Sequence, residues 1–213
     1  MSRVAARSVA RTVSLVVGLA VAVPASAGPP TDTLRHHIDR IFSALADPEL
    51  KGAANAARRH RLLRTYADEA LDFQEAARRT LGTHWEARTP EERTRFVQLF
   101  AALIDHAYLS RLTYNGERVV YDGESMTGNE AVVRARALSP KGSATPVQFQ
   151  MIRDGAGAWR VYDVSFEGMS LVGSYRAQFA KILRAASYDE LVSRLEAKVR
   201  ADAQDIDNPS SAP

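Results

Sequence analysis

Cysteine is absent from this chain of 213 residues. Its absence excludes disulfide bonds, thiolate nucleophiles and metal sites with cysteine ligands. An apolar run at 13–23 spans only 11 residues, whereas a membrane-spanning helix needs ~20. The protein must therefore be held together by an apolar core, and a chain of this size can bury one as a single domain.

The motifs of the common enzyme classes are also missing. The chain has no G-x-S-x-G nucleophile turn, no G-x-x-x-x-G-K-[ST] phosphate loop and no G-x-G-x-x-G fingerprint. The five histidines do not fall in a metal-ligand spacing. The adjacent pair, His36 and His37, diverges by about 100° on a helix. We therefore expect no metal, no cofactor and no catalytic residue.

The first 27 residues have the composition of a secretory signal peptide. They carry three arginines, no acidic residue and the apolar run at 13–23. Ala25-Ser26-Ala27 then forms a small-x-small cleavage site directly before Gly28. We expect cleavage after Ala27 and export in the unfolded state. An N-terminal anchor that stays attached is the alternative.

The charge balance does not indicate a polyanionic partner. The chain has 28 basic and 25 acidic residues, a formal net charge of +3. Loss of three arginines with the signal peptide leaves 25 residues of each sign. Because nucleic-acid binding needs a clustered basic surface, we expect no nucleic acid among the partners.

Apolar residues recur at helical spacing in five stretches, the second of them interrupted near 68–72. These stretches are 31–45, 51–81, a helix beginning at Pro90, 170–185 and 187–200. The start at Pro90 is the clearest, because Thr89 and Glu92 form a capping box around it. We place a single domain at 28–200 and a loosely held polar tail at 201–213.

The hydrophobic period changes from 3.6 to 2 after Asn115-Gly116. Four strand candidates follow, separated by turn residues: 117–124, 130–138, 146–152 and 158–166. Helices, then consecutive strands, then helices indicate an α+β fold. We expect a curved antiparallel sheet of about four strands with helices packed on one face.

The last two strands can be placed in register from their pattern. Pairing Arg153 with Ala158 puts Val147, Phe149, Met151, Tyr162, Val164 and Phe166 on the inward side. The opposite side then carries Gln148, Gln150, Trp159, Val161 and Asp163. A shift by one residue would mix these two sets, which a half-buried sheet resists.

The stretch 159–176 reads W-R-V-Y-D-V-S-F-E-G-M-S-L-V-G-S-Y-R, an apolar strand that turns at Gly168 into a helix capped by Ser170. Together with L-G-T-H-W at 81–85 and T-P-E-E-R at 89–93, it resembles the MlaC-type periplasmic phospholipid carriers, also called the toluene-tolerance auxiliary family. The resemblance extends over about 31–199. Ser174 and Met169 depart from the residues that are frequent in the family, which leaves the headgroup preference open.

The resemblance implies a soluble, monomeric periplasmic carrier with an NTF2-like fold and no catalytic residues. It implies a phospholipid ligand, and as partners an outer-membrane lipoprotein complex and an inner-membrane ABC transporter with an MCE-domain subunit. The small side chains of strand 130–138 would leave space for acyl chains between the sheet and the helices. The expected lipid contacts are Phe96, Phe100, Leu103, Val133, Phe149, Met151, Tyr162, Val164, Val172, Tyr175 and Phe179.

Two other interpretations of the residues stay open. Asp163 could be the general base of a small periplasmic isomerase or hydrolase with a ketosteroid-isomerase-like fold. A structural carboxylate that bonds the turn at 168–170 is the simpler role for this residue. The chain could also be an interaction module with a filled core and no ligand. Arg176 could bond either a headgroup phosphate or a nearby carboxylate.

Overall fold

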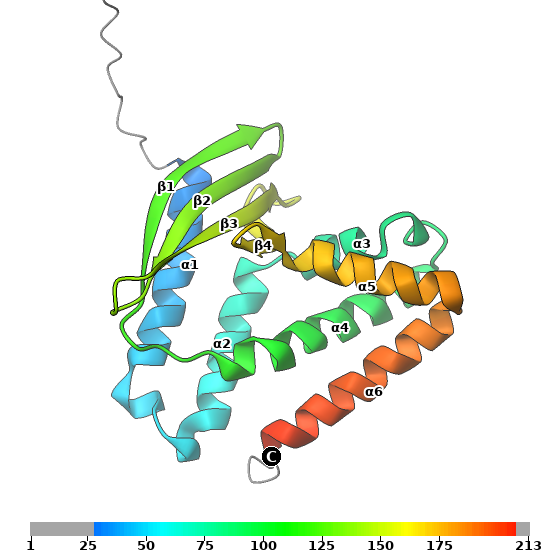
Figure 1. The fold of residues 1–213 in the computed structure, drawn as a ribbon, viewed down its shortest axis with the longest axis horizontal. Helices are drawn as coiled ribbons and strands as arrows, with labels where there is room; N and C mark the ends of the chain where they lie inside the picture. The colour runs from blue at the N-terminus through cyan, green and yellow to red at the C-terminus, as the bar shows by residue number, and fades with distance from the viewer. Residues whose placement is uncertain (1–27, 208–213) are drawn as a thin grey trace, which may run out of the picture.

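The computed structural model describes residues 28–207, so the expected signal peptide at 1–27 and residues 208–213 lie outside the described part. Figure 1 shows a sheet with one long helix along it and a separate group of helices beyond its β4 end. The helices are α1 (Pro29–Ala46), α2 (Ala56–Ala70), α3 (Phe73–Leu81), α4 (Pro90–Ala107), α5 (Leu171–Ala185) and α6 (Tyr188–Asp207). Short 3-10 turns lie at η1 (Pro48–Leu50), η2 (Ala53–Asn55), η3 (Gly82–His84) and η4 (Leu109–Arg111).

The sheet is open and antiparallel, in the order β1-β2-β3-β4-β5. Its strands are β1 (Arg118–Thr127), β2 (Glu130–Leu138), β3 (Ala144–Arg153), β4 (Trp159–Phe166) and β5 (Met169–Ser170). Helix α1 contacts β1, β2 and β4 across one face, while Arg134 and Gln148 on the other face are exposed. The predicted α+β fold is confirmed, with the two-residue β5 added to the four expected strands.

Local capping chemistry sets the helix boundaries where the sequence predicted them. The Thr89 side chain accepts the Glu92 N–H, and the Glu92 carboxylate accepts the Thr89 N–H at 2.9 Å. This is the predicted capping box, with Pro90 in the first turn of α4. Gly82 ends α3 at φ 56, a conformation that favours glycine.

The predicted break near 68–72 lies at Leu71 and Asp72, between α2 and α3. Asp72 caps α3, because its carboxylate accepts the Glu75 N–H at 2.8 Å. The Asp72 N–H donates to the carbonyl of Val161 at 2.8 Å, and Leu71 forms an isolated parallel bridge with the same residue. The residues between α2 and α3 are therefore hydrogen-bonded to the backbone of β4.

Helix α6 runs to Asp207, past the predicted end at Arg200. An ion pair one turn apart extends it, with Lys198 Nζ 3.1 Å from an Asp202 carboxylate oxygen. Such pairs at (i, i+4) stabilise a helix modestly. The polar composition after Arg200 thus belongs in part to a solvent-facing helix.

The predicted register of β4 is wrong, because Arg153 pairs with Trp159 and not with Ala158, and a β-bulge follows along the strand. Phe149 pairs with Val164 but Met151 pairs with Val161, so the register shifts between Gln150 and Met151 and Tyr162 is the extra residue. The shift by one residue at the hairpin end puts Trp159 and Val161 on the inward side, and the bulge then returns Val164 to the side predicted for it. The residues placed on the wrong side are Trp159, Val161 and Tyr162. Phe166, predicted to face inward, is 51% exposed.

Buried apolar side chains form separate clusters and not one continuous core. The cluster of α3 to α6, here called the helical core, contains Ala76, Ala77, Leu81, Trp85, Phe96, Phe100, Leu103, Ile104, Val172, Phe179, Leu191 and Leu195. The cluster between α1 and the sheet, here called the sheet core, contains Leu34, Ala131, Val133, Met151, Trp159 and Val161. A smaller cluster joins α1, η1 and α2 through Ala44, Leu45, Leu50 and Leu63.

Candidate functional site

Six of the predicted lipid contacts lie in or against the helical core: Phe96, Phe100, Leu103, Val172, Tyr175 and Phe179. Phe96 and Phe100 are 0% and 1% exposed, and the Phe179 ring meets both edge-on, with centroids 5.8 and 6.3 Å apart. Tyr175 also meets Phe100 edge-on, at 5.5 Å. Edge-to-face contacts at such separations are favourable for buried rings. These rings therefore pack tightly against one another between α4 and α5.

Four other predicted contacts belong to the sheet side: Val133, Phe149, Met151 and Val164. Val133 and Met151 are fully buried, while Phe149 and Val164 are partly buried. These side chains pack with Leu34 of α1 and not with the aromatic rings of α4 and α5. The predicted contacts are thus divided between two cores, and their role in binding lipid stays a prediction.

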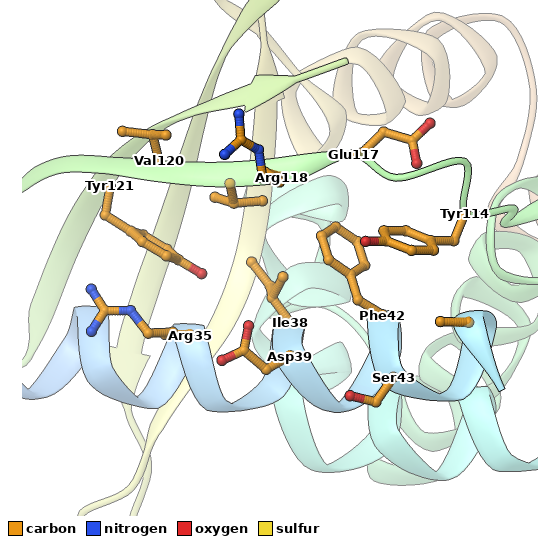
Figure 2. Close-up of a pocket in the computed structure, with 12 residues that line it drawn as sticks. Arg35, Ile38, Asp39, Phe42, Ser43, Tyr114, Glu117, Arg118, Val120 and Tyr121 are labelled. Carbon is orange, nitrogen blue, oxygen red and sulfur yellow. The ribbon is translucent and has the colours of Figure 1, made fainter. Parts of the chain in front are cut away.

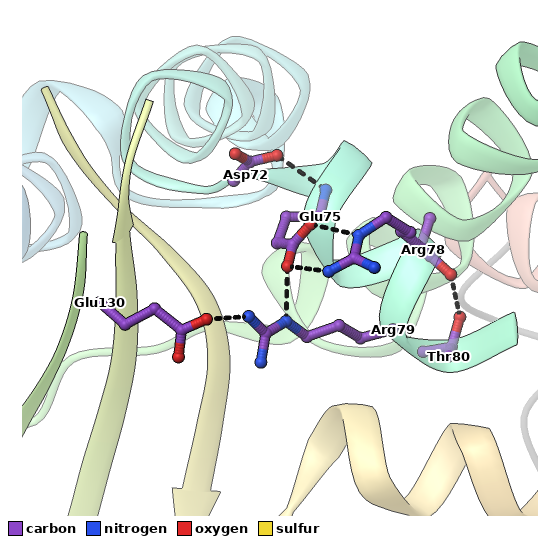
Figure 3. A network of polar contacts seen from close by, with 7 residues as sticks. Asp72, Glu75, Arg78, Arg79, Thr80 and Glu130 are labelled. Atoms are coloured by element: carbon purple, nitrogen blue, oxygen red, sulfur yellow. Dashed lines mark hydrogen bonds and ion pairs between the residues drawn. The ribbon is translucent and has the colours of Figure 1, made fainter. Parts of the chain in front are cut away.

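Tyr162, the remaining predicted contact, lies in a polar junction between the sheet and α3. The Arg79 guanidinium lies over the Tyr162 ring, 3.8 Å from its centroid, an arrangement that is attractive for a cation. Arg79 also donates to Glu75 at 2.6 Å and to Glu130 at 2.5 Å, as Figure 3 shows. Burial opposes ionisation of Glu75, but hydrogen bonds from Arg78 and Arg79 outweigh it and lower the pKa of this carboxyl group.

A cleft that the sequence analysis did not identify opens between α1 and the edge strand β1 (Figure 2). Its volume of about 690 Å³ lies within the ~300–1,000 Å³ typical of ligand pockets. In Figure 2, Ile38 and Phe42 point from α1 toward β1, and Tyr121 points back toward α1. The full lining is Arg35, Ile38, Asp39, Phe42, Ser43, Ala46, Tyr114, Glu117, Arg118, Val119, Val120 and Tyr121.

Small side chains on the neighbouring strand help to create this cleft. Tyr121 pairs with Ala135, and Val119 pairs with Ala137, so two alanines of β2 lie directly beside the cleft wall. The small side chains of 130–138 predicted free space beside this strand. That the space opens toward α1 could not be predicted, because the helical stripe and the strand alternation do not tell how far apart two elements pack.

The cleft combines an apolar interior with charged groups. The Arg35 guanidinium lies 4.9 Å from the centroid of the Tyr121 ring. The Tyr121 hydroxyl is buried and has no hydrogen-bond partner among residues 28–207. Burial, and secondly the charge of Asp39, raise the pKa of Tyr121 to about 12. The Tyr121 side chain is therefore neutral near pH 7. Apolar side chains next to the charged Arg35 and Asp39 suit the cleft to a molecule with an apolar part and a polar part.

Asp163 has the structural role that the sequence analysis favoured over catalysis. Its carboxylate accepts the Ser170 hydroxyl at 2.5 Å and the Val172 N–H at 2.9 Å. Ser170 in turn caps α5, accepting the Gly173 N–H at 2.8 Å. Asp163 is 8% exposed and lies at the start of α5, so both of its oxygens are engaged in holding the β4–α5 connection. This arrangement does not favour the isomerase or hydrolase alternative.

Arg176 lies against the end of α3. Its guanidinium Nε is 3.2 Å from the position that a Cβ at Gly82 would occupy. The close approach explains, together with the positive φ, why glycine suits this turn. The headgroup role considered for Arg176 stays a prediction.

Two further features, a metal site and a membrane-spanning helix, are absent from the described part of the chain. One pair joins α2 to α4, with His60 Nε2 2.7 Å from Asp105 Oδ1. Over residues 28–207 there is no cluster of three or more His, Cys, Asp or Glu side chains suited to a metal. None of the helices described over the same range combines the length and apolar character needed to cross a membrane.

Comparison with known proteins identifies relatives of this fold. The Haemophilus influenzae protein named "Intermembrane phospholipid transport system binding protein MlaC" is 23% identical over 172 residues, covering 78% of this chain and 80% of the relative. The structure of a phospholipid-binding protein from Ralstonia solanacearum in complex with a phospholipid superposes with a TM-score of 0.70 at 22% identity. This superposition covers 83% of this chain and 99% of that chain and shows the shared fold.

A third similarity is weaker. The iota-carbonic anhydrase from a cyanobacterium reaches a TM-score of 0.43 at 16% identity, over 70% of this chain and 96% of that one. This value is too low to support a functional argument. In contrast, the family described as MlaC protein matches residues 35–197, which is most of the sequence. The chain therefore belongs to the MlaC family.

Proposed function

We propose that this protein is a phospholipid carrier that is exported through its N-terminal signal peptide and works in the periplasm. The observation that carries the proposal is the family match over residues 35–197. The names of the two relatives support it, since one is an intermembrane phospholipid transport protein and the other a phospholipid-binding protein. The hydrogen-bonded position of Asp163 favours a carrier over an enzyme.

The acyl chains enter the cleft between α1 and β1 and extend along the sheet face that carries Val133, Phe149, Met151 and Val164. Each CH₂ group removed from water contributes about 0.8 kcal/mol. Lipid in a bilayer already has this stabilisation, so a carrier needs an apolar cavity more than strong polar contacts. The apolar side chains of Ile38 and Phe42 supply such a surface at the mouth. The aromatic residues of the helical core contact lipid only if α4 and α5 separate from each other, because the rings pack between these two helices.

The carrier moves lipid between an outer-membrane lipoprotein complex and an inner-membrane ABC transporter with an MCE-domain subunit. Support for these partners comes from the resemblance of the whole chain to the family. The carrier acts as a monomer. A transfer assay between vesicles that hold each complex would test this step separately from lipid binding. Lipid movement that is independent of the complexes would contradict the proposed partners.

Lipid extraction from purified protein, followed by mass spectrometry, tests the binding function. We expect about one phospholipid per chain, and lipid-free protein would contradict the proposal. Val119→Arg places a charge in the cleft, and Val132→Arg is a matched control because Val132 lies on the face of β2 opposite to Ala131 and Val133. We expect the first variant to lose most of its lipid and the second to keep it. Equal lipid content in the two variants would place the ligand elsewhere.

A further inference from the structure

Helix α1 begins without the usual local capping groups. Its N-cap residue is Gly28, which has no side chain to accept a hydrogen bond. Pro29 and Pro30 follow and have no N–H to donate. The first free donor of the helix is therefore the Thr31 N–H, which needs a partner from another part of the chain.

Glu124 of β1 supplies this partner. One of its carboxylate oxygens accepts the Thr31 N–H at 2.9 Å and the Thr31 hydroxyl at 2.5 Å. Glu124 pairs with Val133, so it lies on the face of the sheet that contacts α1. The shift in register between Tyr121 and Gly123 brings it there. Thr31 is only 1% exposed, and a carboxylate at a helix N-terminus is favourable.

Gly28 lies directly against the same carboxylate. A Cβ at position 28 would be 1.9 Å from Glu124 Oε1 and 2.8 Å from Glu124 Cδ. No side chain fits there unless the carboxylate moves. Gly28 is also the residue that follows the small-x-small sequence Ala25-Ser26-Ala27, where the sequence predicts cleavage. The residue that a leader peptidase would expose is thus the residue that touches Glu124.

We propose that removal of the signal peptide creates an ammonium group at Gly28 that forms an ion pair with Glu124 and fastens α1 to β1. A leader peptidase adds water across the Ala27–Gly28 amide. Ala27 leaves as a carboxylate with the signal peptide, and the released Gly28 amine takes up a proton. Before cleavage, the Gly28 nitrogen is a neutral amide, and within residues 28–207 the donors to Glu124 are those of Thr31. The inference rests on the proposed export.

The consequence is that processing completes one wall of the cleft between α1 and β1. The precursor has the capping bonds of Thr31 but lacks the ion pair, so its first helical turn is held less firmly against the sheet. A carboxylate that meets both a helix N-terminus and an ammonium group gains from both charges. The mature chain is therefore the more stable form.

Thermal unfolding of two chains tests this idea, one beginning at Gly28 and one beginning at Ala27. The second chain has its ammonium group one residue farther from Glu124. We expect the chain that begins at Gly28 to have the higher Tm, by about 2–4 °C. In Glu124→Gln versions of both, the amide oxygen can still accept from Thr31 but the charge is gone, so the difference should vanish. Equal Tm values for the two original chains, or a difference that persists in their Glu124→Gln versions, would overturn the proposal.

A second pair of variants tests the contact at Gly28 itself. Gly28→Ala forces the Glu124 carboxylate away from Thr31, so we expect a lower Tm and no remaining effect of Glu124→Gln. Gly155→Ala is the matched control, since a Cβ there meets nothing within 4 Å. Equal Tm values for the two alanine variants would contradict the proposed contact.

The mass of the exported chain separates the two proposals. A mature chain that begins at Gly28 supports the cleavage step, and any other start overturns it. Lipid content is measured on the same sample. A chain with lipid but no Tm coupling would overturn only the ion pair, and a chain with the coupling but no lipid would overturn only the carrier function.

Discussion

The helical core and the sheet core bury apolar side chains in different ways. Between α4 and α5, the rings of Phe96, Phe100 and Phe179 meet one another closely and are almost fully buried. Between α1 and the sheet, β2 contributes the smaller Ala131, Val133 and Ala135, and an open cleft lies next to the Ala135 end, where Tyr121 pairs with this alanine. The difference shows that the ring-rich helices fill their own interior, whereas the sheet side keeps an open cleft beside small side chains.

The largest effect is expected from emptying the helical core. Phe100→Ala removes a ring that is 1% exposed and contacts the rings of Tyr175 and Phe179, so the free energy of unfolding should fall by about 3–5 kcal/mol. Urea unfolding measures the loss. Phe166→Ala is the control because Phe166 is 51% exposed, and its effect should stay within about 0.5 kcal/mol. Similar losses for both variants would mean that the helical core is loosely packed.

Adding volume to each core sharpens the comparison. Ala77→Leu overfills the helical core, where Ala77 is 0% exposed, and should lower the free energy of unfolding by about 1–3 kcal/mol. Ala135→Leu adds the same atoms beside Tyr121, whose side chain lines the cleft, so we expect the new side chain to extend toward the open space and its loss to be smaller. The difference in urea midpoint between the two variants is the measurement. A larger loss for Ala135→Leu would show that the sheet side has no spare room.

The connection between the two cores can be weakened at its cap. Ser170→Ala removes the hydroxyl that bonds both Asp163 and the Gly173 N–H, so we expect a loss of about 0.5–2 kcal/mol in the free energy of unfolding. Ser174→Ala, on the next turn of α5, is the matched control, since its hydroxyl donates to the carbonyl of Ser170 and caps no N–H of the helix within the described residues. An unchanged stability of Ser170→Ala would argue against the capping role.

The smallest change in stability is expected from ionisation of the Tyr121 side chain in the cleft. Its folded pKa of about 12 lies above the ordinary value of 10.0, so the unfolded phenol ionises first as the pH rises. The stability that Tyr121 contributes is present below about pH 10 and is lost between about pH 10 and about pH 12. Tyr121→Phe should remove this part of the alkaline decline in urea midpoint. An identical decline in both proteins would show that the phenol is open to water.

Capping residues made much of the fold predictable. Thr89 with Glu92 indicated the start of α4, and Ser170 indicated the start of α5, because both caps depend on residues only a few positions apart. The alternation of 130–138 predicted both ends of β2 correctly. The role of Asp163 was also predictable, since the turn that it bonds is nearby in the chain.

The bulge and the division into two cores were not predictable in the same way. No local sequence signal marks Tyr162 as an extra residue, and its position follows from packing against Arg79 of a distant helix. Likewise, Phe96 and Met151 are both apolar, so the pattern alone could not assign them to different cores. The cleft was missed because its size depends on how far α1 stands from β1.

The bulge also limits how the length of β4 can change. Removing Tyr162 would restore simple alternation along the strand and leave Asp163 on its present face, where its carboxylate reaches Ser170 and Val172. A deletion within the turn at 154–157 would leave the strand faces as they are. The strand can therefore lose one residue at Tyr162 and keep Asp163 at the start of α5, whereas a deletion that reverses the faces of the residues after it should be rejected.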